Sequence, residues 1–243
     1  MNMGQQVVII TGAGNGIGRE TAKLLATQDK ALVLVDFDEK SGQDTLHAVK
    51  EHQQQAIFVH ADVSKSQDVK KYVEAAKEAF GRIDAFINNA GVLSPPSLLA
   101  DLEEETFDNV ISVNLKGTFL GLKYVLKEME QQRSGVIVNT SSAAGIQGQS
   151  YLGGYAASKH GVIGLTRTAA IEYGPSGIRV NAICPGGVMT NMTKGLTSNP
   201  KENGPLRRLA NASEIANVIA FLISEEASYV NGAVVPIDGG LTS

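Results

Sequence analysis

The sequence predicts an α/β fold in which one doubly wound, seven-stranded parallel sheet is flanked by helices. Two observations support this prediction. Seven short apolar runs alternate along the chain with longer amphipathic stretches, which is the pattern of βαβ units with right-handed crossovers. Runs such as residues 7–10 (Val-Val-Ile-Ile) are apolar at every position, as expected for strands that helices cover on both faces. No linker or change of composition interrupts the series, so residues 1–243 are expected to form a single domain.

The expected strands are the short apolar runs, bounded by glycine and polar residues. In chain order they are residues 6–11, 31–36, 56–61, 83–88, 135–141, 178–184 and 233–237. The stretches between them place apolar residues three and four positions apart, which predicts amphipathic helices. These are expected at residues 16–27, 39–53, 66–80, 103–131, 151–173 and 213–224. Residues 193–205, rich in glycine, asparagine, serine and proline, are expected to form a loop.

Composition and charge narrow the class of function. The net charge of −4 gives no attraction to nucleic acid or to an anionic membrane, so neither is expected as a partner. No apolar stretch approaches the roughly 18 residues that span a bilayer. The start of the chain has neither a basic segment nor a cleavage site, so no signal peptide is expected and the expected location is cytoplasmic. The histidines form no metal-ligand spacing, and Cys184, the only cysteine, is expected to be a buried filler.

A glycine-rich segment, residues 11–18 (Thr-Gly-Ala-Gly-Asn-Gly-Ile-Gly), lies between the first expected strand and the first expected helix. Glycines there allow a tight turn and let backbone N–H groups approach a pyrophosphate at the positive end of the helix, as in Rossmann-type folds. A plain glycine-rich turn is the alternative, because the run alone requires no ligand. The residues at the ends of the following strands favour a dinucleotide site over a plain turn.

Asp36 lies at the end of the second expected strand, 18 residues past Gly18. A carboxylate at that place can accept hydrogen bonds from both ribose hydroxyls of a dinucleotide. It also repels the additional phosphate of NADP, and neither Asn15 nor Phe37 offers a cation to bind that phosphate. NAD is therefore the expected cofactor rather than NADP. The alternative role of Asp36 is a helix N-cap or a turn acid.

The third and fourth expected strands are followed by polar and small residues. Asp62 and Val63 follow the third strand, and residues 88–91 (Asn-Asn-Ala-Gly) close the fourth. Ligands of an open parallel sheet bind beyond the carboxyl ends of its strands, so these residues are expected to line the cofactor. Each of them alone would equally suit an ordinary turn.

Tyr155 and Lys159 lie four positions apart and therefore share one face of an expected helix. A free tyrosine has a pKa of about 10, which is too high for proton transfer at neutral pH. A nearby ammonium stabilises the phenolate and lowers that pKa, as general acid–base catalysis near pH 7 requires. The pair thus predicts a catalytic acid–base. A surface pair is the alternative, because this spacing is common on amphipathic helices.

With these motifs the chain resembles the short-chain dehydrogenase/reductase family over essentially its whole length. The family's fold is a seven-stranded parallel sheet flanked by helices, which agrees with the fold expected from the residues. The matching pieces are Thr11-Gly12, Gly16-Ile17-Gly18, Asp62, Asn88-Asn89-Ala90-Gly91, Asn114, Ser142, Tyr155, Lys159, Pro185-Gly186 and Thr190.

The resemblance implies an NAD-dependent oxidoreductase that transfers a hydride to or from a carbonyl or secondary alcohol, with four catalytic residues. Ser142 is expected to hydrogen-bond the substrate oxygen, and Tyr155 to exchange a proton with it. Lys159 is expected to bind the nicotinamide ribose and lower the pKa of Tyr155. Asn114 is expected to help hold a water that relays protons through the lysine. The alternatives are a capping role for Ser142 and a helix bend at Asn114.

The resemblance also implies that Thr190 contacts the nicotinamide carboxamide and that Ile17 and Val188 offer backbone N–H groups to the cofactor. A loop turn is the alternative role of Thr190. The whole expected cofactor-binding set is Gly12, Asn15, Gly16, Ile17, Gly18, Asp36, Phe37, Asp62, Val63, Asn88, Ala90, Gly91, Tyr155, Lys159, Pro185, Gly186, Val188 and Thr190.

The expected substrate pocket is mainly apolar, which favours an apolar and cyclic ketone or alcohol. Residues 117–129 and 227–240 look especially like bacterial family members that act on cyclic ketones and alcohols. By analogy with the family, residues of about 187–210 are expected to form the substrate loop. The expected substrate-binding residues are Leu93, Ser142, Ile146, Gln149, Tyr155 and Met192.

Two other functions are open. One is a 3-oxoacyl-carrier-protein reductase, but Asp36 opposes the NADP that such enzymes usually prefer. Of the two basic residues with which they dock the acidic carrier, Arg133 matches one and Ser176 stands at the other. Residues 185–208 also form a segment about five residues shorter than in those reductases, which implies a reduced loop. The other function is a catalytically silent nucleotide sensor, which ranks last because the tyrosine and the lysine are both present.

Assembly is the last expectation from the resemblance. The family pairs the helices expected at residues 103–131 and 151–173 between subunits, and it uses the C-terminal strand at a second interface. A homotetramer with two-fold interfaces is therefore expected.

Overall fold

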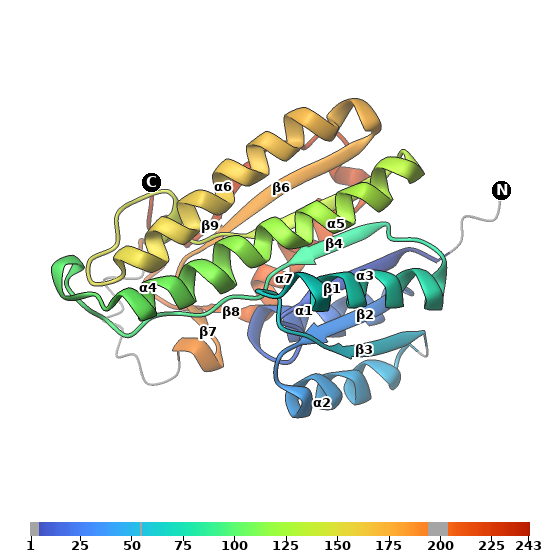
Figure 1. The fold of residues 1–243 in the computed structure, drawn as a ribbon, viewed down its shortest axis with the longest axis horizontal. Helices are drawn as coiled ribbons and strands as arrows, with labels where there is room; N and C mark the ends of the chain where they lie inside the picture. Colours follow the sequence, from blue (N-terminus) through green and yellow to red (C-terminus); the bar gives the residue numbers. More distant parts are fainter. Residues whose placement is uncertain (1–4, 54, 194–203) are drawn as a thin grey trace.

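Seven strands of the described chain pair in parallel to form one sheet, in the order β3-β2-β1-β4-β5-β6-β9. The chain is seen in a computed structural model that describes residues 5–53, 55–193 and 204–243. The sheet winds outward from β1 to β3 in one direction and from β4 to β9 in the other, which confirms the doubly wound fold (Figure 1). Its strands are β1 (Val7–Thr11), β2 (Ala31–Asp36), β3 (Ala56–His60), β4 (Ala85–Asn88), β5 (Gly135–Thr140), β6 (Ile178–Pro185) and β9 (Val234–Ile237).

Helices cover both faces of this sheet (Figure 1). Along β1, Val8 and Ile10 pack under α1, α2 and α7, whereas Ile9 between them faces α3, α5 and α6. All three side chains are fully buried, which explains why the strand is apolar at every position. The helices are α1 (Gly16–Ala26), α2 (Glu39–Lys50), α3 (Ser66–Phe80), α4 (Glu104–Val110), α5 (Gly117–Gln132), α6 (Gly153–Tyr173) and α7 (Ala212–Ile223). Among the described residues, no helix has the length and hydropathy needed to cross a membrane.

Residues 103–131, expected to form one helix, are divided into three parts. A π-helical segment, Ile111–Lys116, separates α4 from α5. Asn114 lies inside this segment, and the Thr118 hydroxyl donates to its backbone carbonyl at 2.7 Å. This side-chain bond competes for a carbonyl that the α-helical ladder would otherwise use. Such π-helical turns occur frequently at functional sites, and this one lies beside the candidate site described below.

Smaller differences from expectation concern where elements begin. The strand expected from residue 83 starts at Ala85, because the Gln132 amide pairs with both backbone groups of Ile83 at 3.0 and 2.7 Å. The helix expected from residue 151 starts at Gly153, because Tyr151 has a left-handed φ of 66°.

The expected substrate loop, residues 187–210, is described only at its two ends. Residues 194–203 lie outside the described residues. The two ends form a small parallel sheet that the sequence did not indicate, made of β7 (Val188–Met189) and β8 (Ala210–Asn211). Strands of two residues are too short to show a period of two.

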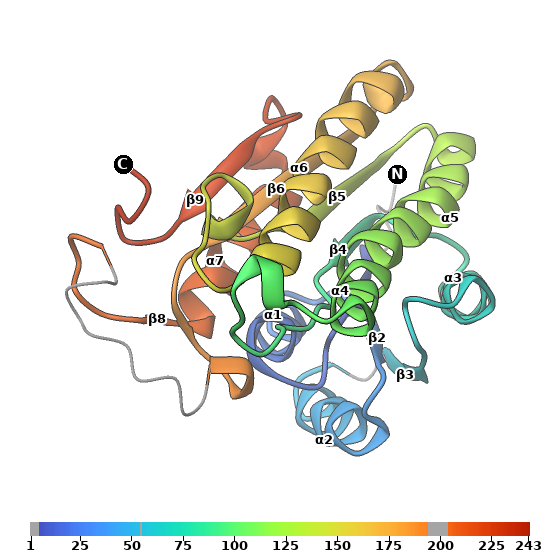
Figure 2. The same cartoon turned by 60° about the vertical axis from the view of Figure 1, so that its left-hand side comes forward.

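The carboxyl ends of the strands face one end of the molecule (Figure 1). In Figure 1, α4, β7 and the C-terminus all lie there, and Figure 2 shows the same end turned by 60°. In a doubly wound sheet, this is the edge at which ligands bind.

Candidate active site

A cavity of about 980 Å³ lies along the carboxyl edge of the sheet. Its lining reaches from Asp36, which ends β2, and Asp62, which follows β3, to Tyr155 on α6. This volume is near the upper end of the roughly 300–1,000 Å³ usual for small-molecule sites. Most of the predicted site residues line the cavity. Within the described chain, those outside its lining are Gly18, Asn88, Asn114 and Ile146.

The glycine-rich turn is shaped by requirements that only glycine meets. Gly12 and Gly16 have φ values of 65° and 53°, in the left-handed region that disfavours side chains. A Cβ at Gly18 would overlap the carbonyl oxygen of Gly12, so Gly18 allows α1 to start directly against β1. Asn15, in an extended conformation, makes no side-chain capping bond to α1, and the first turn of that helix carries no acid. Its first-turn N–H groups therefore face the cavity uncapped in the described chain.

Asp36 holds the end of this turn. Its carboxylate accepts hydrogen bonds from the backbone N–H groups of Gly14 at 2.7 Å and of Asp38 at 2.9 Å. The N-cap role considered for Asp36 belongs instead to Asp38, whose side chain accepts from the first turn of α2. Phe37 is 70% exposed and also lines the cavity. The Asp36 carboxylate is thus fixed by two backbone groups at one end of the cavity.

Asp62 and Asn88, both predicted to bind the cofactor, have different surroundings. Asp62 lines the cavity and accepts from the hydroxyl of Ser64 at 2.7 Å. Burial raises the pKa of Asp62, but its bonds to Ser64 and Lys65 outweigh this and hold the pKa below its usual value. Asn88 is buried and donates to the Thr118 carbonyl and the Asn139 amide oxygen at 3.0 and 3.2 Å. Its side chain joins β4 to β5 and α5 beneath the site.

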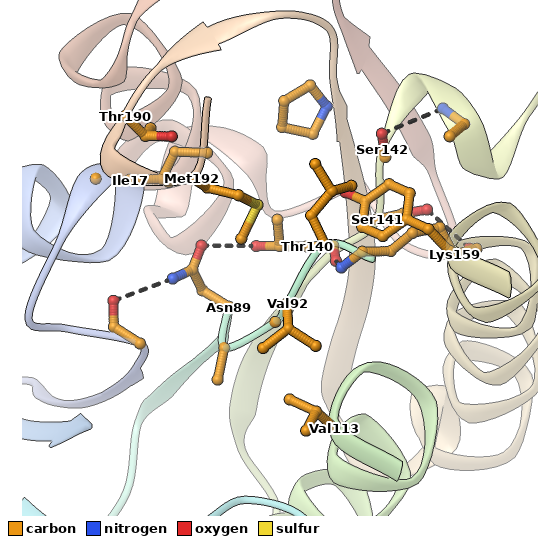
Figure 3. Close-up of a pocket in the computed structure, with 18 of the residues that line it drawn as sticks. Ile17, Asn89, Val92, Val113, Thr140, Ser141, Ser142, Lys159, Thr190 and Met192 are labelled. Carbon is orange, nitrogen blue, oxygen red and sulfur yellow. Dashed lines mark hydrogen bonds between the residues drawn. The ribbon is translucent and has the colours of Figure 1, made fainter. Parts of the chain in front are cut away.

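Asn89, expected with its neighbours at the end of the fourth strand to line the cofactor, lines the cavity. Its amide donates to the Thr11 carbonyl at 3.0 Å. Its oxygen accepts from the Thr140 hydroxyl at 3.3 Å (Figure 3). It therefore connects the carboxyl ends of β1 and β5 across β4. The two asparagines therefore have different surroundings. The Asn88 side chain lies in the core, and Asn89 lines the cavity.

Lys159 is buried at the base of the cavity. Its ammonium donates to the Thr140 carbonyl at 2.9 Å and lies 5.6 Å from the centre of the Tyr155 ring. Burial lowers the pKa of Lys159 to about 8. Because burial disfavours the charged form, the ammonium is held in place mainly by the Thr140 carbonyl.

Tyr155 has a pKa above its usual value of 10. Burial of the phenol causes the rise, and a hydrogen bond with the Ser142 side chain opposes it. This differs from the expectation that Lys159 lowers the pKa of Tyr155. The ammonium lies under the ring and is bonded to Thr140, so desolvation outweighs its attraction for a phenolate. The neutral phenol is therefore the form that this arrangement favours.

Ser142 lies two residues after the end of β5, in an extended conformation. Its hydroxyl oxygen accepts from the Ala144 backbone N–H at 3.2 Å, so the capping role left open for it is present (Figure 3). The same side chain lines the cavity beside Tyr155 and opposes the rise in the pKa of that residue. Capping fixes the serine hydroxyl next to the tyrosine hydroxyl, and the two donors can converge on one oxygen atom.

Asn114 lies outside the described cavity lining but bonds two segments of the site. Its amide accepts from the Val92 N–H at 2.8 Å and donates to the Val92 carbonyl at 3.0 Å and the Ser158 hydroxyl at 3.2 Å. The side chain therefore binds the segment after β4 to the helix that carries Tyr155. The π-helical segment places Asn114 so that this amide reaches both.

The other predicted residues after β6 line the cavity on the side of the glycine turn. Thr190 packs against Gly16, where an added Cβ would lie 2.9 Å from its methyl group. The amide of the next residue, Asn191, donates to the Asn15 side chain at 2.7 Å. The start of the expected substrate loop is thereby tied to the turn before α1. Met192 extends from it into the cavity toward Thr140 (Figure 3).

The cavity near Tyr155 has a mixed lining. Leu93, Gln149 and Met192 line it as predicted, whereas Ile146 is 37% exposed and lies outside the described lining. Sequence reasoning missed several lining residues. Residues 92 and 113 were signalled by their neighbours in the matched motifs, but Asn109 lies on α4 and Leu241 near the C-terminus, where no pattern marks them. The missed residues here are Val92, Asn109, Val113 and Leu241.

Known proteins match this chain over nearly its whole length. A protein-family model described as "Enoyl-(Acyl carrier protein) reductase" matches residues 12–242. Levodione reductase of Leifsonia aquatica is 47% identical over 97% of this chain and 93% of its own length. Cis-4-hydroxycyclohexanecarboxylate dehydrogenase of Sinomonas cyclohexanicum is 39% identical over 98% and 97%. A 3-oxoacyl-[acyl-carrier-protein] reductase of Thermotoga maritima is 42% identical over 99% of both chains.

Solved structures show the same fold. The crystal structure of levodione reductase has a TM-score of 0.92 and 46% identity, with 96% of each chain covered. A 3-ketoacyl-(acyl-carrier-protein) reductase from Brucella melitensis, complexed with NADH, has a TM-score of 0.93 and 32% identity over 98% of each chain. A third structure, ElxO with NADP bound, has a TM-score of 0.91 and 32% identity over 98% of each chain.

Proposed function

The chain belongs to the short-chain dehydrogenase/reductase family, and from this premise we propose that it interconverts a cyclic ketone and its secondary alcohol with NAD(H). Membership makes it an oxidoreductase that acts on the CH–OH group of a small molecule and uses a nicotinamide dinucleotide. The choice of NAD, the roles of the site residues and the cyclic substrate are the proposal. Its main support is the meeting of Ser142, Tyr155 and Lys159 at one end of the cavity.

The other end of the cavity fits a nicotinamide dinucleotide. The left-handed glycines and the uncapped start of α1 suit a pyrophosphate, since they bring backbone N–H groups to it. A Cβ at Gly91 would lie 3.4 Å from the Lys159 ammonium, so the backbone after β4 passes close to this lysine. We assign the adenosine ribose to Asp36, the nicotinamide ribose to Tyr155 and Lys159, and the carboxamide to Thr190. When bound, the nicotinamide ring supplies or accepts the hydride.

Asp36 supports NAD over NADP. Its carboxylate is fixed at the cavity by Gly14 and Asp38, where it would repel a 2′-phosphate. The formal charges among the described lining residues are Asp36, Asp62 and Lys159. Lys159 lies at the Tyr155 end, so no lining cation of the described chain stands beside Asp36 to bind that phosphate.

Proton transfer is the work of Tyr155 in this proposal. In the direction of reduction, Ser142 and Tyr155 donate hydrogen bonds to the ketone oxygen, and the phenol gives its proton to that oxygen as the hydride reaches the carbon. The raised pKa of Tyr155 keeps the phenol protonated at neutral pH, ready to act as this acid. In the direction of oxidation, the phenolate form of Tyr155 takes the hydroxyl proton of the alcohol as the hydride leaves its carbon, and the Lys159 ammonium beneath the ring stabilises that phenolate.

The lining near Tyr155 supports an uncharged, compact substrate. Val92, Leu93 and Met192 offer apolar surface there, and the ionisable groups of the described lining at this end are the catalytic pair itself. A carboxylate on the substrate would lose its hydration without gaining a free cationic partner. The relatives named for levodione and for cis-4-hydroxycyclohexanecarboxylate support a ring-shaped ketone or alcohol. A neutral cyclohexanone or cyclohexanol fits both lines of support.

A 3-oxoacyl-carrier-protein reductase is the second candidate, favoured by the relative from Thermotoga maritima. The surroundings of Arg133, the residue that matches a carrier-docking position, count against this candidate. Its guanidinium donates to the Ser176 hydroxyl at 3.2 Å and to the Pro175 carbonyl at 3.1 Å. These bonds fold the arginine onto its own chain, and Ser176 supplies no second cation.

The test is an activity screen with both cofactors. Purified protein is assayed for reduction of NAD⁺ and NADP⁺ with substituted cyclohexanols, linear secondary alcohols, sugars and 3-hydroxyacyl thioesters. We expect the highest kcat/KM with a neutral cyclohexanol, and NAD⁺ preferred by at least about tenfold, or about 1.4 kcal/mol. Asp36→Ala should narrow that ratio by admitting NADP⁺. Highest activity on the thioester would replace the proposal with the second candidate, and equal use of both cofactors would overturn the assignment of Asp36.

The expected homotetramer is also part of the proposal. The outer surface of α5 and α6 carries exposed apolar side chains, among them Phe119 at 46% and Ile171 at 78%. Apolar groups exposed on a pair of adjacent helices suit a two-fold contact with a second copy. The expected cytoplasmic location stays a prediction.

A further inference from the structure

The last six residues of the chain form a tight turn that Asp238 organises. The turn follows β9 directly, and we call residues 238–243 the C-terminal turn. One carboxylate oxygen of Asp238 accepts from the Gly240 N–H at 2.9 Å. The other accepts from the backbone N–H and the hydroxyl of Thr242 at 3.0 and 2.6 Å, and the Asp238 carbonyl accepts from the Leu241 N–H at 3.2 Å. Gly239 and Gly240 have left-handed φ values of 65° and 84°, which this reversal of direction requires.

The C-terminal turn is packed against two segments of the site. A Cβ at Gly186 would lie 2.9 Å from the Cα of Asp238, so the turn touches the backbone directly after β6. A Cβ at Gly204 would lie 2.7 Å from the Leu241 nitrogen, and the Leu206 N–H donates to the Gly239 carbonyl at 3.2 Å. Residues 204 and 206 belong to the expected substrate loop. The turn therefore contacts both ends of the chain segment that borders the substrate.

Leu241 is the residue of this turn that reaches the cavity. It is partly buried and belongs to the cavity lining. The order of the sheet fixes the part of the cavity that it borders. The turn follows β9, which pairs with β6, and β6 pairs with β5, the strand that leads to Ser142. Asp36 ends β2 and Asp62 follows β3, at the opposite side of the sheet. Leu241 therefore borders the reacting end of the cavity and not its adenosine end.

We propose that Leu241 is a specificity-determining wall of the substrate site, and that Asp238 is the positioning residue that holds it there. The inference rests on the proposed function, since it takes the space near Tyr155 to be the substrate site. Leu241 limits the bulk that a ketone can carry on the side facing the C-terminal turn. Asp238 acts only through the turn, since its two oxygens are occupied by Gly240 and Thr242.

The test measures size selectivity. The full-length parent, Leu241→Ala and Leu241→Phe are assayed for NADH oxidation with two series of ketones of increasing bulk, one cyclic (cyclohexanone to trimethylcyclohexanones) and one linear (butanone to 2-octanone). Leu241→Ala should raise the ratio of kcat/KM for bulky over small ketones by about tenfold or more, because a few methylene groups in an apolar pocket change discrimination on that scale. Leu241→Phe should lower the same ratio by a similar factor, and the KM for NADH should stay at the parent value in both.

Two further sets of variants separate positioning from general damage. Leu24→Ala is the matched control, because Leu24 is also partly buried but lies on α1 outside the cavity lining, so its selectivity ratio should equal that of the parent. Asp238→Asn and Thr242→Val should shift the ratio in the direction of Leu241→Ala, by several-fold. A merely structural role would lower the melting temperature and reduce activity on all ketones alike.

The outcomes distinguish this inference from the function on which it rests. Activity on linear ketones alone would refute the cyclic substrate, and the linear series would still test Leu241. If both Leu241 variants keep the parent's selectivity ratio while turning over the same ketones, Leu241 is not a wall of the site. If they shift it but Asp238→Asn and Thr242→Val do not, Asp238 is not the positioning residue.

Discussion

At the scale of single residues, burial has opposite effects on the two groups that meet in the site. It raises the pKa of the Tyr155 phenol and lowers that of the Lys159 ammonium to about 8. Both shifts have the same cause, because a low-dielectric site disfavours whichever form of a group is charged. The sequence indicated the attraction between the two groups but not the burial, since four-residue spacing fixes a shared helix face and not its depth in the fold.

Tyr155→Phe tests the acid–base role of the phenol. The ring stays in place, so NADH affinity should survive, whereas turnover should fall by about 10²–10⁴-fold, the scale for removing a positioned acid–base group. Tyr151→Phe is the matched control, because Tyr151 is 59% exposed and lies outside the described lining of the cavity. Steady-state kinetics and NADH fluorescence titration measure the two effects. Near-parent turnover in Tyr155→Phe would remove the phenol from the mechanism.

The lowered pKa of Lys159 predicts how the free energy of unfolding depends on pH. The folded chain releases the Lys159 proton near pH 8, whereas the unfolded chain keeps it to about 10.5. Between these values the unfolded state binds more protons, so this group makes the free energy of unfolding rise with pH. Below pH 8 both states are protonated and the cost of burying the charge is present in full.

Lys159→Met removes this dependence. Relative to the variant, the parent should therefore gain about 3 kcal/mol of unfolding free energy between pH 8 and 10.5, at about 1.4 kcal/mol for each unit of pKa shift. Urea unfolding followed by circular dichroism, repeated at intervals across this range, measures the difference between the two proteins. A difference that stays constant with pH would show that Lys159 keeps its proton in the folded state.

At the scale of elements, the strands were predicted closely because their burial on both faces makes them apolar throughout, as in β1 and β2. The elements that shape the site were predicted less well. The π-helical segment Ile111–Lys116 lies within the stretch that the sequence indicated as one helix, and the tertiary bonds of its Asn114 to Val92 and Ser158 have no counterpart in the sequence pattern. The pairing of β7 with β8 depends on residues 22 positions apart, from Val188 to Ala210, which no local pattern encodes.

The glycine turn was predicted as a motif, and the structure adds the reason for its last glycine. A Cβ at Gly18 would overlap the Gly12 carbonyl oxygen, so Gly18→Ala must push the start of α1 away from β1. We expect NADH affinity to fall by at least about tenfold, or about 1.4 kcal/mol, because the N–H groups at the start of the helix move with it.

Gly164→Ala is the matched control for Gly18→Ala. It also places an alanine in a helix, but no described atom lies within 4 Å of its added Cβ. Its NADH affinity, measured by the same fluorescence titration, should equal that of the parent. An equal affinity in Gly18→Ala would mean that the turn absorbs the methyl group without moving the helix.

At the scale of the whole molecule, the site is assembled from segments spread over nearly the entire chain, from Gly12 to Leu241. Sequence motifs located those segments whose chemistry is distinctive, such as the glycines and the Tyr–Lys pair. They did not locate Leu241, because a single leucine in a C-terminal turn carries no signal until the sheet brings β9 beside β6. The same limit applies to assembly, since the surface that meets a second copy is defined only by what the fold leaves exposed.

The exposed face of α6 is where we expect a second copy of the chain to bind. Gly164 is exposed on this face, and an added Cβ there meets no described atom within 4 Å, so a larger side chain is compatible with the fold of one subunit. Ile171 lies two turns further along the same face, 78% exposed. If this face packs against a second copy, the absence of a side chain at Gly164 allows close approach of the helices.

Gly164→Arg should therefore break the contact between copies and leave the subunit folded. We expect the parent to be a tetramer by light scattering at micromolar concentration, and Gly164→Arg to run as a dimer or monomer with an unchanged far-ultraviolet circular dichroism spectrum. Thr27→Arg, exposed at the end of α1, is the matched control and should remain a tetramer. A parent that is monomeric would refute the assembly altogether. A tetramer that survives Gly164→Arg would move the interface away from α6, because an arginine at the centre of a close helix contact must bury a charge without a partner.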